Sequence, residues 1–254
     1  MRVLGTGKSD KNDPNDARSV AIAALRSPGL GSVQAANHAD VLGLLAKRNE
    51  DIGNLRTKLV CRLHAQIASP AAGGIAKELN ASDANGLLGA FEPSSPAEAT
   101  RRQLALELLE DVRRLDTQLK ESHKRIKLAV RASGTSLTGV YGIGPVLACA
   151  LIGHTGDVSR FTSRDQFAAY NGTAPVEVSS GGRVTHRLSR RGNRKLNHAV
   201  HMVAICQIRQ IHSEGRAYFE KKVAEGKTKR EAIRSLKRQI SNTVFRHLVL
   251  DTKR

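Results

Sequence analysis

A turn-rich part of the chain is separated from a helical one by the stretch Ser179-Ser-Gly-Gly-Arg-Val-Thr-His-Arg-Leu-Ser-Arg-Arg-Gly-Asn-Arg-Lys-Leu-Asn-His-Ala-Val-His201. Two adjacent serines precede a pair of glycines, and arginines follow them closely. Arg-Arg-Gly-Asn is a turn signal, and the apolar-periodic run after it predicts a helix that begins at Arg194. The stretch therefore predicts an arginine-rich connection placed directly before the helices of the last third.

The same residue types suit phosphodiester chemistry. A serine hydroxyl on flexible backbone can attack phosphorus, while nearby guanidinium groups neutralise the phosphate oxygens and favour the alkoxide. The alternative is an arginine-rich hairpin that only grips a DNA backbone. On these residues alone the alternative is preferred, because Ser-Ser-Gly-Gly is common in ordinary loops. The candidate nucleic-acid contacts of the stretch are Arg183, Arg187, Arg190, Arg191, Arg194 and Lys195.

The charge of the chain indicates a polyanionic partner. Its 254 residues carry a formal net charge of +18, with a pI near 10.5. Residues 179–254 hold 19 Lys and Arg against 5 Asp and Glu, so +14 of that charge lies in the last third. This balance points to nucleic acid and predicts a steep salt dependence of binding. Aromatic residues make up only 3%, which argues against proteins that read single strands by base stacking.

The cysteines and the hydropathy pattern indicate a cytoplasmic protein. Cys61, Cys149 and Cys206 are odd in number and far apart, so each is expected to pack as a small apolar residue rather than to form a disulfide or bind a metal. No apolar run approaches the roughly 18 residues of a membrane span, and the N-terminus lacks the apolar region of a signal peptide. We therefore expect no membrane partner.

Two acidic residues near the N-terminus are candidate metal ligands. Asp13 and Asp16 lie one turn apart where a helix is expected to start, so both carboxylates can face one cation, and Mg²⁺ suits such a pair. The alternative is helix capping, because Asp is favoured at a helix N-terminus for its own sake. The residues alone favour capping.

Two long amphipathic helices are expected in the middle of the chain. Between residues 41 and 63 the apolar residues Leu45, Ile52, Leu55, Leu59 and Leu63 recur at helical spacing. Between 96 and 131 a seam interrupted by one polar residue consists of Leu108, Val112, Leu115, Leu119, Ser122 and Ile126. Residues 69–95 are rich in small residues and predict a linker with short helical pieces. An antiparallel helical hairpin and a dimerising coiled coil both fit this pattern.

Gly142-Ile-Gly-Pro145, followed by a helix of small residues, resembles half of a helix-hairpin-helix. In that motif the backbone amides of a glycine turn face a DNA phosphate, so Gly142 and Gly144 are candidate DNA contacts. A tight turn with close helix packing is an equally good interpretation. The last third predicts helices from Arg194 to about 211, over 214–224, and from 226 to about 250. His198 and His201 have no third ligand in register and are expected to pack or to face phosphate.

Taken in order, these segments resemble the DEDD-type insertion-sequence transposases. That family pairs a resolvase-like DEDD domain with a C-terminal serine-bearing transposase domain, and its members are guided by a bridge RNA. The order and spacing of the matching segments over nearly the whole chain carry the resemblance. They are Lys11-Asn-Asp13-Pro-Asn-Asp16-Ala17-Arg18, Asn54–His64, Gly142-Ile-Gly-Pro145, Phe161–Pro175, Ser179-Ser-Gly-Gly182, Ser189-Arg-Arg-Gly-Asn193 and Gly226–Ala232.

The resemblance implies roles for individual residues. Asp13 and Asp16 correspond to the last two acidic residues of the metal-binding tetrad, which implies Mg²⁺ as cofactor. Ser180, next to the glycines, corresponds to the nucleophile that becomes covalently joined to DNA, with Ser179 as the alternative. Arg183, Arg187 and Arg190 would then hold the phosphate. The family's partners are the DNA of the element ends and target, a guide RNA and further copies of the chain, in the nucleoid of a bacterial cytoplasm.

The chain departs from the family pattern at its N-terminus. The first Asp and the Glu of the tetrad would lie upstream of Met1, so the resemblance predicts an N-terminally truncated copy. The expected fold is mainly α: a remnant of an α/β resolvase-like (RNase H-like) domain over residues 1–35, a helical hairpin or coiled-coil region over 36–132, and a C-terminal helical DNA-binding domain over 133–254. The expected function is an enzyme, a transposase or DNA recombinase of a mobile element. The alternatives are a nucleic-acid-binding remnant without catalysis and a structural protein that binds DNA junctions through a helix-hairpin-helix.

Overall fold

The computed structural model describes residues 13–26, 37–68, 81–180, 183–188 and 192–253, and for 176–180 and 183–188 it describes the backbone. These segments belong to two compact units, Met1–Ala36 and Asn37–Arg254. As expected from the sequence, the described chain is mainly helical. The domain boundaries at residues 35 and 132 stay a prediction.

The described part of the first unit is one helix, α1 (Asp13–Arg26). It begins at Asp13, where the sequence predicts a helix start, and Pro14 fits the first turn, where no backbone donor is needed. Asp13 and Asp16 lie in that first turn, and Arg26 lies in the last turn. Charges of this sign at these ends stabilise the helix dipole. The predicted resolvase-like remnant rests on α1 alone in the residues described, and it stays a prediction.

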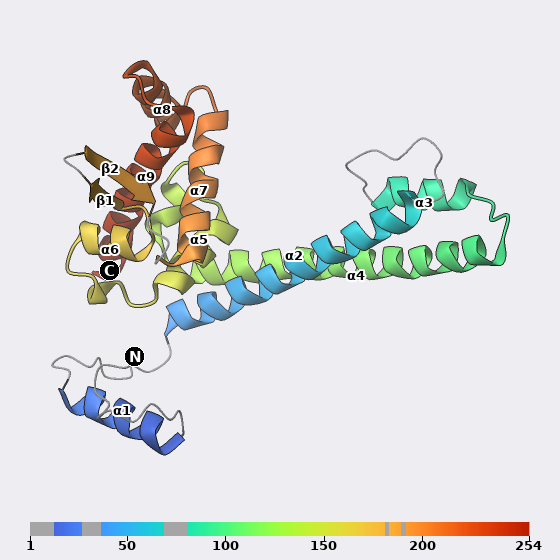
Figure 1. The fold of residues 1–254 in the computed structure, drawn as a ribbon, viewed down its shortest axis with the longest axis horizontal. Coiled ribbons are helices and arrows are strands. Elements are labelled where there is room, and N and C mark those ends of the chain that lie inside the picture. Colours follow the sequence, from blue (N-terminus) through green and yellow to red (C-terminus); the bar gives the residue numbers. More distant parts are fainter. Residues whose placement is uncertain (1–12, 27–36, 69–80, 181–182, 189–191, 254) are drawn as a thin grey trace. The chain divides into compact units, whose positions relative to one another are not determined.

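The second unit contains an arm of two long helices, α2 (His38–Ala68) and α4 (Pro96–Ala132), which lie side by side (Figure 1). Their cross-contacts show that they run in opposite directions. Ser122 Oγ donates to Asn49 Oδ1 over 2.9 Å, and farther along the arm Arg56 pairs with Asp116. The chain thus forms the helical pair within itself, whereas pairing of two chains as a coiled coil stays a prediction.

Local signals place the start of α4 where the sequence predicts it. The Ser95 side chain caps the helix by accepting from the Glu98 N–H over 3.2 Å, and Pro96 occupies the first helical position. The Glu98 carboxylate in turn accepts from the Ser94 N–H over 2.7 Å. These bonds satisfy donors that a helix start leaves open.

The predicted apolar seam forms the core of the arm. Val112, Leu115, Ser122 and Ile126 of α4 are buried, and Leu108 and Leu119 pack partly buried in the middle of the arm. Ile52, Leu59 and Leu63 of α2 are buried as expected. Leu55 is a wrong prediction: its side chain is 48% exposed. Three residues after Ile52, it lies about 60° around the helix from that buried residue, at the edge of the apolar stripe.

The end of the arm is closed by a short helix, α3 (Ala81–Ala90). It is the helical piece expected in the 69–95 linker, of which residues 69–80 lie outside the described chain. α3 packs on α2 and α4 through a small core, and Arg102 Nε donates to the carbonyl of Leu88 over 2.9 Å. The members of this core are Leu63, Ile67, Ala84, Leu88, Ala105 and Leu109.

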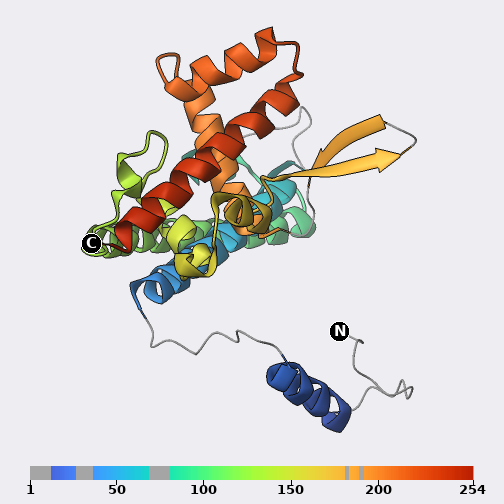
Figure 2. The ribbon, with the colours of Figure 1, turned by 90° about the vertical axis from the view of Figure 1, so that its left-hand side faces the viewer.

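The rest of the second unit is a helical body at the other end of the arm (Figures 1 and 2). Two 3₁₀ turns and a two-stranded hairpin connect its helices. The elements in chain order are η1 (Ser136–Gly139), α5 (Pro145–Thr155), η2 (Val158–Arg160), α6 (Arg164–Tyr170), β1 (Pro175–Ser180), β2 (Arg183–Leu188), α7 (Arg194–Arg209), α8 (Glu214–Ala224) and α9 (Lys229–Asp251). All three predicted C-terminal helices are present.

The main core lies where the arm enters this body. The first turns of α2 and the last turns of α4 bury side chains together with α5, α6, α7 and α9, so the arm and the body share one core. α2 crosses α5 at Gly43 and Gly153, where a Cβ on either glycine would meet backbone of the other. The large side chains that fill this core include Leu42, Ile126, Leu151, Phe167, Leu196, Val203 and Val244.

The last helix begins at Lys229, three residues after the start at 226 that the sequence predicts. Gly226 has a φ of +88° and ends the preceding helix, which favours glycine there. Thr228 and Glu231 then form a capping box: Thr228 Oγ1 accepts from the Glu231 N–H, and the Glu231 carboxylate accepts from the Thr228 N–H.

The cysteine prediction is right at one position and wrong at two. Cys149 is fully buried and its Sγ donates to the carbonyl of Leu42, while burial raises the pKa of its thiol to about 11. Cys61 and Cys206 are exposed, so neither packs as a buried apolar residue. In the described residues, no helix has the length and hydropathy needed to cross a membrane.

Candidate nucleic-acid interface

The two serines lie at the far end of the β1–β2 hairpin, which extends away from the helices in Figure 2. The strands are antiparallel, and the register pairs Ser180 with Arg183 and Ser179 with Val184. Residues 181–182 lie outside the described chain. A two-residue Gly-Gly connection between such strands is a common hairpin turn. Both candidate nucleophiles are thus the last two residues of β1, directly before Gly181 in the sequence, and their role stays a prediction.

The root of the hairpin is clamped by backbone contacts between the residues before and after it. The Asn193 N–H donates to the carbonyl of Tyr170 over 2.6 Å, and the Asn193 side chain donates to the Tyr170 hydroxyl over 3.2 Å. A Cβ on Gly192 would lie 2.6 Å from the backbone nitrogen of Gly172, so only glycine allows this approach. Both ends of the hairpin are thus held on one side of the helical body.

A buried polar network anchors the same root to α7 and α9. Asn171 is fully buried, and its Nδ2 donates to Ser241 Oγ over 2.8 Å. Asn197 Nδ2 donates to the carbonyl of Asn171 over 2.8 Å, while its Oδ1 accepts from Lys237 Nζ over 2.6 Å. Buried polar groups joined in this way fix one arrangement of the chain, because leaving any of them unpaired is costly.

Aromatic rings and the Arg160 guanidinium pack together at the hairpin root. Phe161 packs edge-on against Phe167 with ring centroids 5.3 Å apart. The Arg160 guanidinium lies 4.4 Å from the centroid of the Tyr170 ring and 4.6 Å from that of Phe161. Although burial alone would raise the pKa of the Tyr170 phenol, the hydrogen bonds from Asn193 and Arg160 lower it.

Two predicted DNA contacts lie directly behind the hairpin, in the first turn of α7. Arg194 and Lys195 are exposed there, and Asn193 caps the helix by accepting from the Lys195 N–H over 3.0 Å. Positive charge at a helix N-terminus opposes the helix dipole, so helix stability does not explain these residues. Lys195 pairs with Glu50 of α2, and both partners are partly exposed. A partly exposed pair of this kind contributes little to stability.

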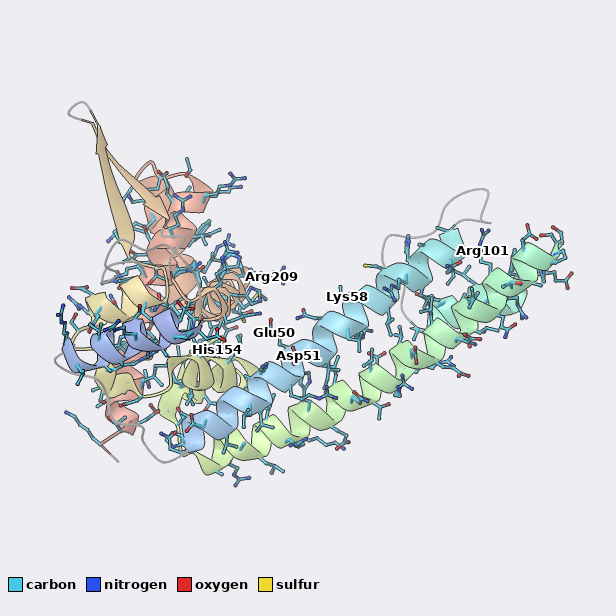
Figure 3. The ribbon with its side chains drawn as sticks, turned by 60° about the horizontal axis from the view of Figure 1, so that its bottom comes forward. Glu50, Asp51, Lys58, Arg101, His154 and Arg209 are labelled. Carbon is cyan, nitrogen blue, oxygen red and sulfur yellow. The ribbon has the colours of Figure 1, made fainter. Side chains whose placement is uncertain are left out.

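The surroundings of this pair are seen in Figure 3. Glu50 and Asp51 lie on the part of α2 that is nearest to α7, whereas Lys58 and Arg101 lie farther out along the arm. His154, near the end of α5, has a pKa lowered by burial. The predicted contacts Arg183 and Arg187 lie on β2, where only the backbone is described, and Arg190 and Arg191 lie outside the described residues.

The glycine turn at 142–144 does not join the serine hairpin. Gly142 has a φ of +86° and faces Val203 and Cys206 of α7. These lie nine and twelve residues beyond Arg194, which corresponds to about 14–18 Å along a helix. Gly144 caps α5 without a side-chain bond, and the element before the turn is the short η1 rather than an α-helix. The helix-hairpin-helix interpretation stays a prediction.

The carboxylates proposed for Mg²⁺ belong to the first unit. Asp13 and Asp16 lie in the first turn of α1, where helix capping explains them equally well. Among the described residues, no three His, Cys, Asp or Glu side chains gather in a way that suits a metal ion. Two carboxylates can hold Mg²⁺ together with oxygens of water or of a substrate phosphate, which is the usual coordination of this ion in proteins.

The histidines differ from each other in their surroundings. His198 is exposed, and His201, one turn later, is half-buried. Burial lowers the pKa of His201, and the charges of Lys237 and His198 lower it further. His201 is therefore neutral near pH 7 and above, beside a buried lysine.

Three residues that hold the hairpin root, Asn171, Asn197 and Lys237, were not predicted from the sequence. One signal was present for Lys237. Together with Ser241, Val244 and Leu248 it follows the spacing of the apolar stripe of α9, where a lysine is out of place. The convergence of these residues on the hairpin depends on tertiary contacts that no local pattern reveals.

The glycine turn and the serine hairpin lie inside a segment that is found in known proteins, whereas Lys237 and Ser241 of α9 lie beyond it. Residues 134–220 match the model of the transposase IS116/IS110/IS902 family. Over this segment the chain is similar to insertion-sequence transposases, and the segment includes the glycine turn, the serine hairpin and the residues at both ends of that hairpin. We call residues 134–220 the transposase-family segment.

Individual relatives agree with that relationship. A "probable family 20 transposase" of Pseudomonas aeruginosa is 29% identical over 192 residues, which are 73% of this chain and 56% of that protein. The insertion element IS900 uncharacterized 42 kDa protein of Mycobacterium paratuberculosis is 29% identical over 155 residues, 59% of this chain and 38% of its own length. The insertion element IS110 uncharacterized 43.6 kDa protein of Streptomyces coelicolor is 32% identical over 110 residues, 43% and 27% respectively. The chain spans about half or less of these relatives.

Proposed function

We propose that this chain is part of an insertion-sequence transposase, and that a serine of its β1–β2 hairpin cleaves and rejoins DNA. Ser180 is the proposed nucleophile, with Ser179 as the alternative. The observation that carries the proposal is the position of both serines at the end of a hairpin that lies inside the transposase-family segment.

The reaction keeps the number of phosphate ester bonds constant, because each step forms one such bond and breaks another. Ser180 Oγ attacks a backbone phosphorus, and its proton passes to water or a nearby base. A serine–phosphate ester forms while the bond from phosphorus to one strand end breaks, and the departing oxygen takes up a proton as a hydroxyl. Rejoining reverses these steps when another strand hydroxyl attacks the ester, so no high-energy cofactor is consumed.

The charges behind the hairpin support binding of the DNA backbone. Arg194 and Lys195 are exposed at the start of α7. Both positions oppose the dipole of their helix, which argues that phosphate contacts account for them. Arg183, Arg187 and Arg190 are the proposed phosphate contacts of the hairpin.

The test is detection of a covalent protein–DNA species. The whole chain is incubated with labelled duplex DNA that carries the ends of the parent insertion element, and products are separated on a denaturing gel. We expect a slowly migrating adduct that protease removes, and we expect Ser180→Ala to abolish it. Thr185→Val is the matched control, because it removes a hydroxyl from the same hairpin and keeps a strand-forming residue.

The outcomes separate the alternatives. Loss of the adduct in Ser179→Ala but not in Ser180→Ala would move the nucleophile by one residue. An adduct that survives both single changes and the double change would contradict the serine mechanism. DNA binding with a steep salt slope and no adduct would identify a nucleic-acid-binding protein without catalysis.

Finer features of the resemblance belong to this proposal as well. They are an Mg²⁺ site that includes Asp13 and Asp16, a guide RNA, assembly of several copies and a place in the bacterial nucleoid. The Asp13→Asn/Asp16→Asn double variant tests the first, since it should remove any dependence of adduct formation on Mg²⁺ concentration.

A further inference from the structure

A pocket of about 320 Å³ lies at the root of the serine hairpin, between the chain entering β1 and the first half of α9. Its volume is in the range of small-molecule sites. Its wall is strongly basic: Lys227, Arg234, Lys237 and Arg238 line it together with Glu231 and Thr173. Pro175, the first residue of β1, also lines the pocket, and so the pocket and the hairpin share a boundary.

The lysine at this pocket is buried without an anionic partner. Lys237 is only 8% exposed, and one of its N–H groups donates to the neutral side chain of Asn197 over 2.6 Å. Within the described chain, none of the ion pairs and no other hydrogen bond involves Lys237. Lysine is almost never fully buried unless it is paired. The site is therefore built for a negative group that the described chain does not supply.

The other charged residues of the pocket also leave its positive charge without a matching negative charge. Glu231 is the carboxylate of the wall, but its Oε2 already accepts from the Thr228 N–H over 2.9 Å and from the Thr228 hydroxyl over 2.7 Å. Arg238 pairs with Asp165 through one nitrogen, while its Nη1 is buried and has no hydrogen-bond partner in the described structure. Arg234 has no ion pair among the described residues and is exposed.

We infer that this pocket binds a phosphate group, with Lys237 and Arg238 as the buried donors and Arg234 and Lys227 at its edge. The inference rests on the proposed function for its source of phosphate, a nucleic-acid backbone that reaches the serine hairpin. The chemistry of the site is shared by a free phosphate or a small phosphoester. Its opening beside β1 lets a strand whose phosphate it holds continue toward Ser179 and Ser180.

The pKa of the Lys237 amine agrees with a site whose anion is not supplied by the described chain. Burial lowers the pKa of the Lys237 amine to about 8, and the charge of Arg234 adds to the effect. His201, which faces it from α7, has a lowered pKa and offers no negative charge. A phosphate within about 4–6 Å favours the protonated amine and raises its pKa, commonly by about 1–3 pH units.

The test follows this one amine in the whole chain. Lysine side chains are labelled with ¹³C at Cε, and the resonance that is absent in Lys237→Met is titrated with pH. Three conditions are compared: no added anion, inorganic phosphate, and a duplex oligonucleotide. We expect a free pKa near 8 that rises by at least about one unit when the pocket is filled.

Binding of the labelled oligonucleotide, measured by fluorescence anisotropy, supplies the second readout. Lys237→Met should weaken affinity by about tenfold or more, because hydrogen bonds to charged groups are strong. Lys229→Met removes an equal charge from the same helix outside the pocket and should weaken it less than about fivefold. Lys237→Arg keeps the charge and should retain most of the affinity.

Each result bears on the inference. A pKa raised by the oligonucleotide supports a backbone phosphate, and a pKa raised by inorganic phosphate alone supports a small phosphate compound as the occupant. An unchanged pKa in both conditions, with equal affinities for Lys237→Met and Lys229→Met, would overturn it. None of these measurements requires cleavage, so failure here and failure of the serine mechanism are distinguishable.

Discussion

Lys237→Met should make the folded chain more stable at pH 7, although it removes a residue from the centre of the hairpin root. A free lysine amine has a pKa of 10.5, and burial lowers that of Lys237 to about 8. This difference of about 2.5 pH units corresponds to about 3.4 kcal/mol of cost to the folded state when the amine is charged. Methionine has a similar length and carries no charge to bury.

The expected gain is smaller than that upper bound. The variant also loses the hydrogen bond to Asn197 Oδ1, which is worth about 1–1.5 kcal/mol, and the remaining amide oxygen has partial access to water. We therefore expect a net stabilisation of about 1–2 kcal/mol at pH 7. For a chain of this size that raises the Tm by about 2–8 °C.

The pH dependence identifies the cause of that gain. As pH rises above 8, the Lys237 amine progressively loses its proton in the folded chain, while the unfolded chain still holds it. This group therefore makes the wild type more stable as pH rises toward 10.5. Below pH 8 both states are protonated and the full cost remains. The stability difference between Lys237→Met and wild type should therefore be largest at pH 7 and shrink by pH 9.5.

The assay is thermal unfolding followed by circular dichroism in phosphate-free buffer, at pH 7 and at pH 9.5. Lys229→Met is the control and should leave the Tm within about 2 °C at both values, because it is an exposed surface position. A Lys237→Met variant that is less stable than wild type by more than about 1 kcal/mol at pH 7 would refute the reasoning, since the charged amine would then be stabilised by a partner within the fold.

Three further predictions concern the same region and its support. Gly192→Ala should loosen the contact between the two ends of the hairpin, because the added Cβ would lie 2.6 Å from the backbone nitrogen of Gly172. The expected result is faster amide hydrogen exchange at Asn193, with protection in the arm unchanged. Exchange at the wild-type rate would contradict the prediction. The affinity for an oligonucleotide should fall as pH rises above about 8 in the wild type, since Lys237 loses its charge while Arg234 and Arg238 keep theirs; in anisotropy titrations Lys237→Arg should lack this fall up to pH 10. Gly153→Ala should lower stability by about 2 kcal/mol or more, because its Cβ would meet the backbone of Gly43 where α2 crosses α5; an unchanged Tm would show that the crossing can open.

The local signals in the sequence determined most of the helices. Alternating steps of three and four place Val112, Leu115, Ser122 and Ile126 on the face of α4 that is buried in the structure, and the Ser-Pro start and the Thr-Lys-Arg-Glu box mark where α4 and α9 begin. The charge of residues 179–254 and the Ser-Ser-Gly-Gly turn pointed to the same hairpin that the transposase-family segment contains. These features depend on neighbours in the chain, which is why a sequence reveals them.

The tertiary structure alone decided which side chains meet at the root of that hairpin. Asn171, Asn197 and Lys237 are up to 66 residues apart in sequence, yet hydrogen bonds join them into one buried network. It also separated the glycine turn at Gly142 from the serine hairpin, although the sequence offers both as candidate DNA contacts. A pattern of periodicity records which face of a helix is apolar, but it does not record which helix covers that face. The basic pocket at Lys237 arises where α9 packs beside the start of β1, and only the folded chain brings those surfaces together.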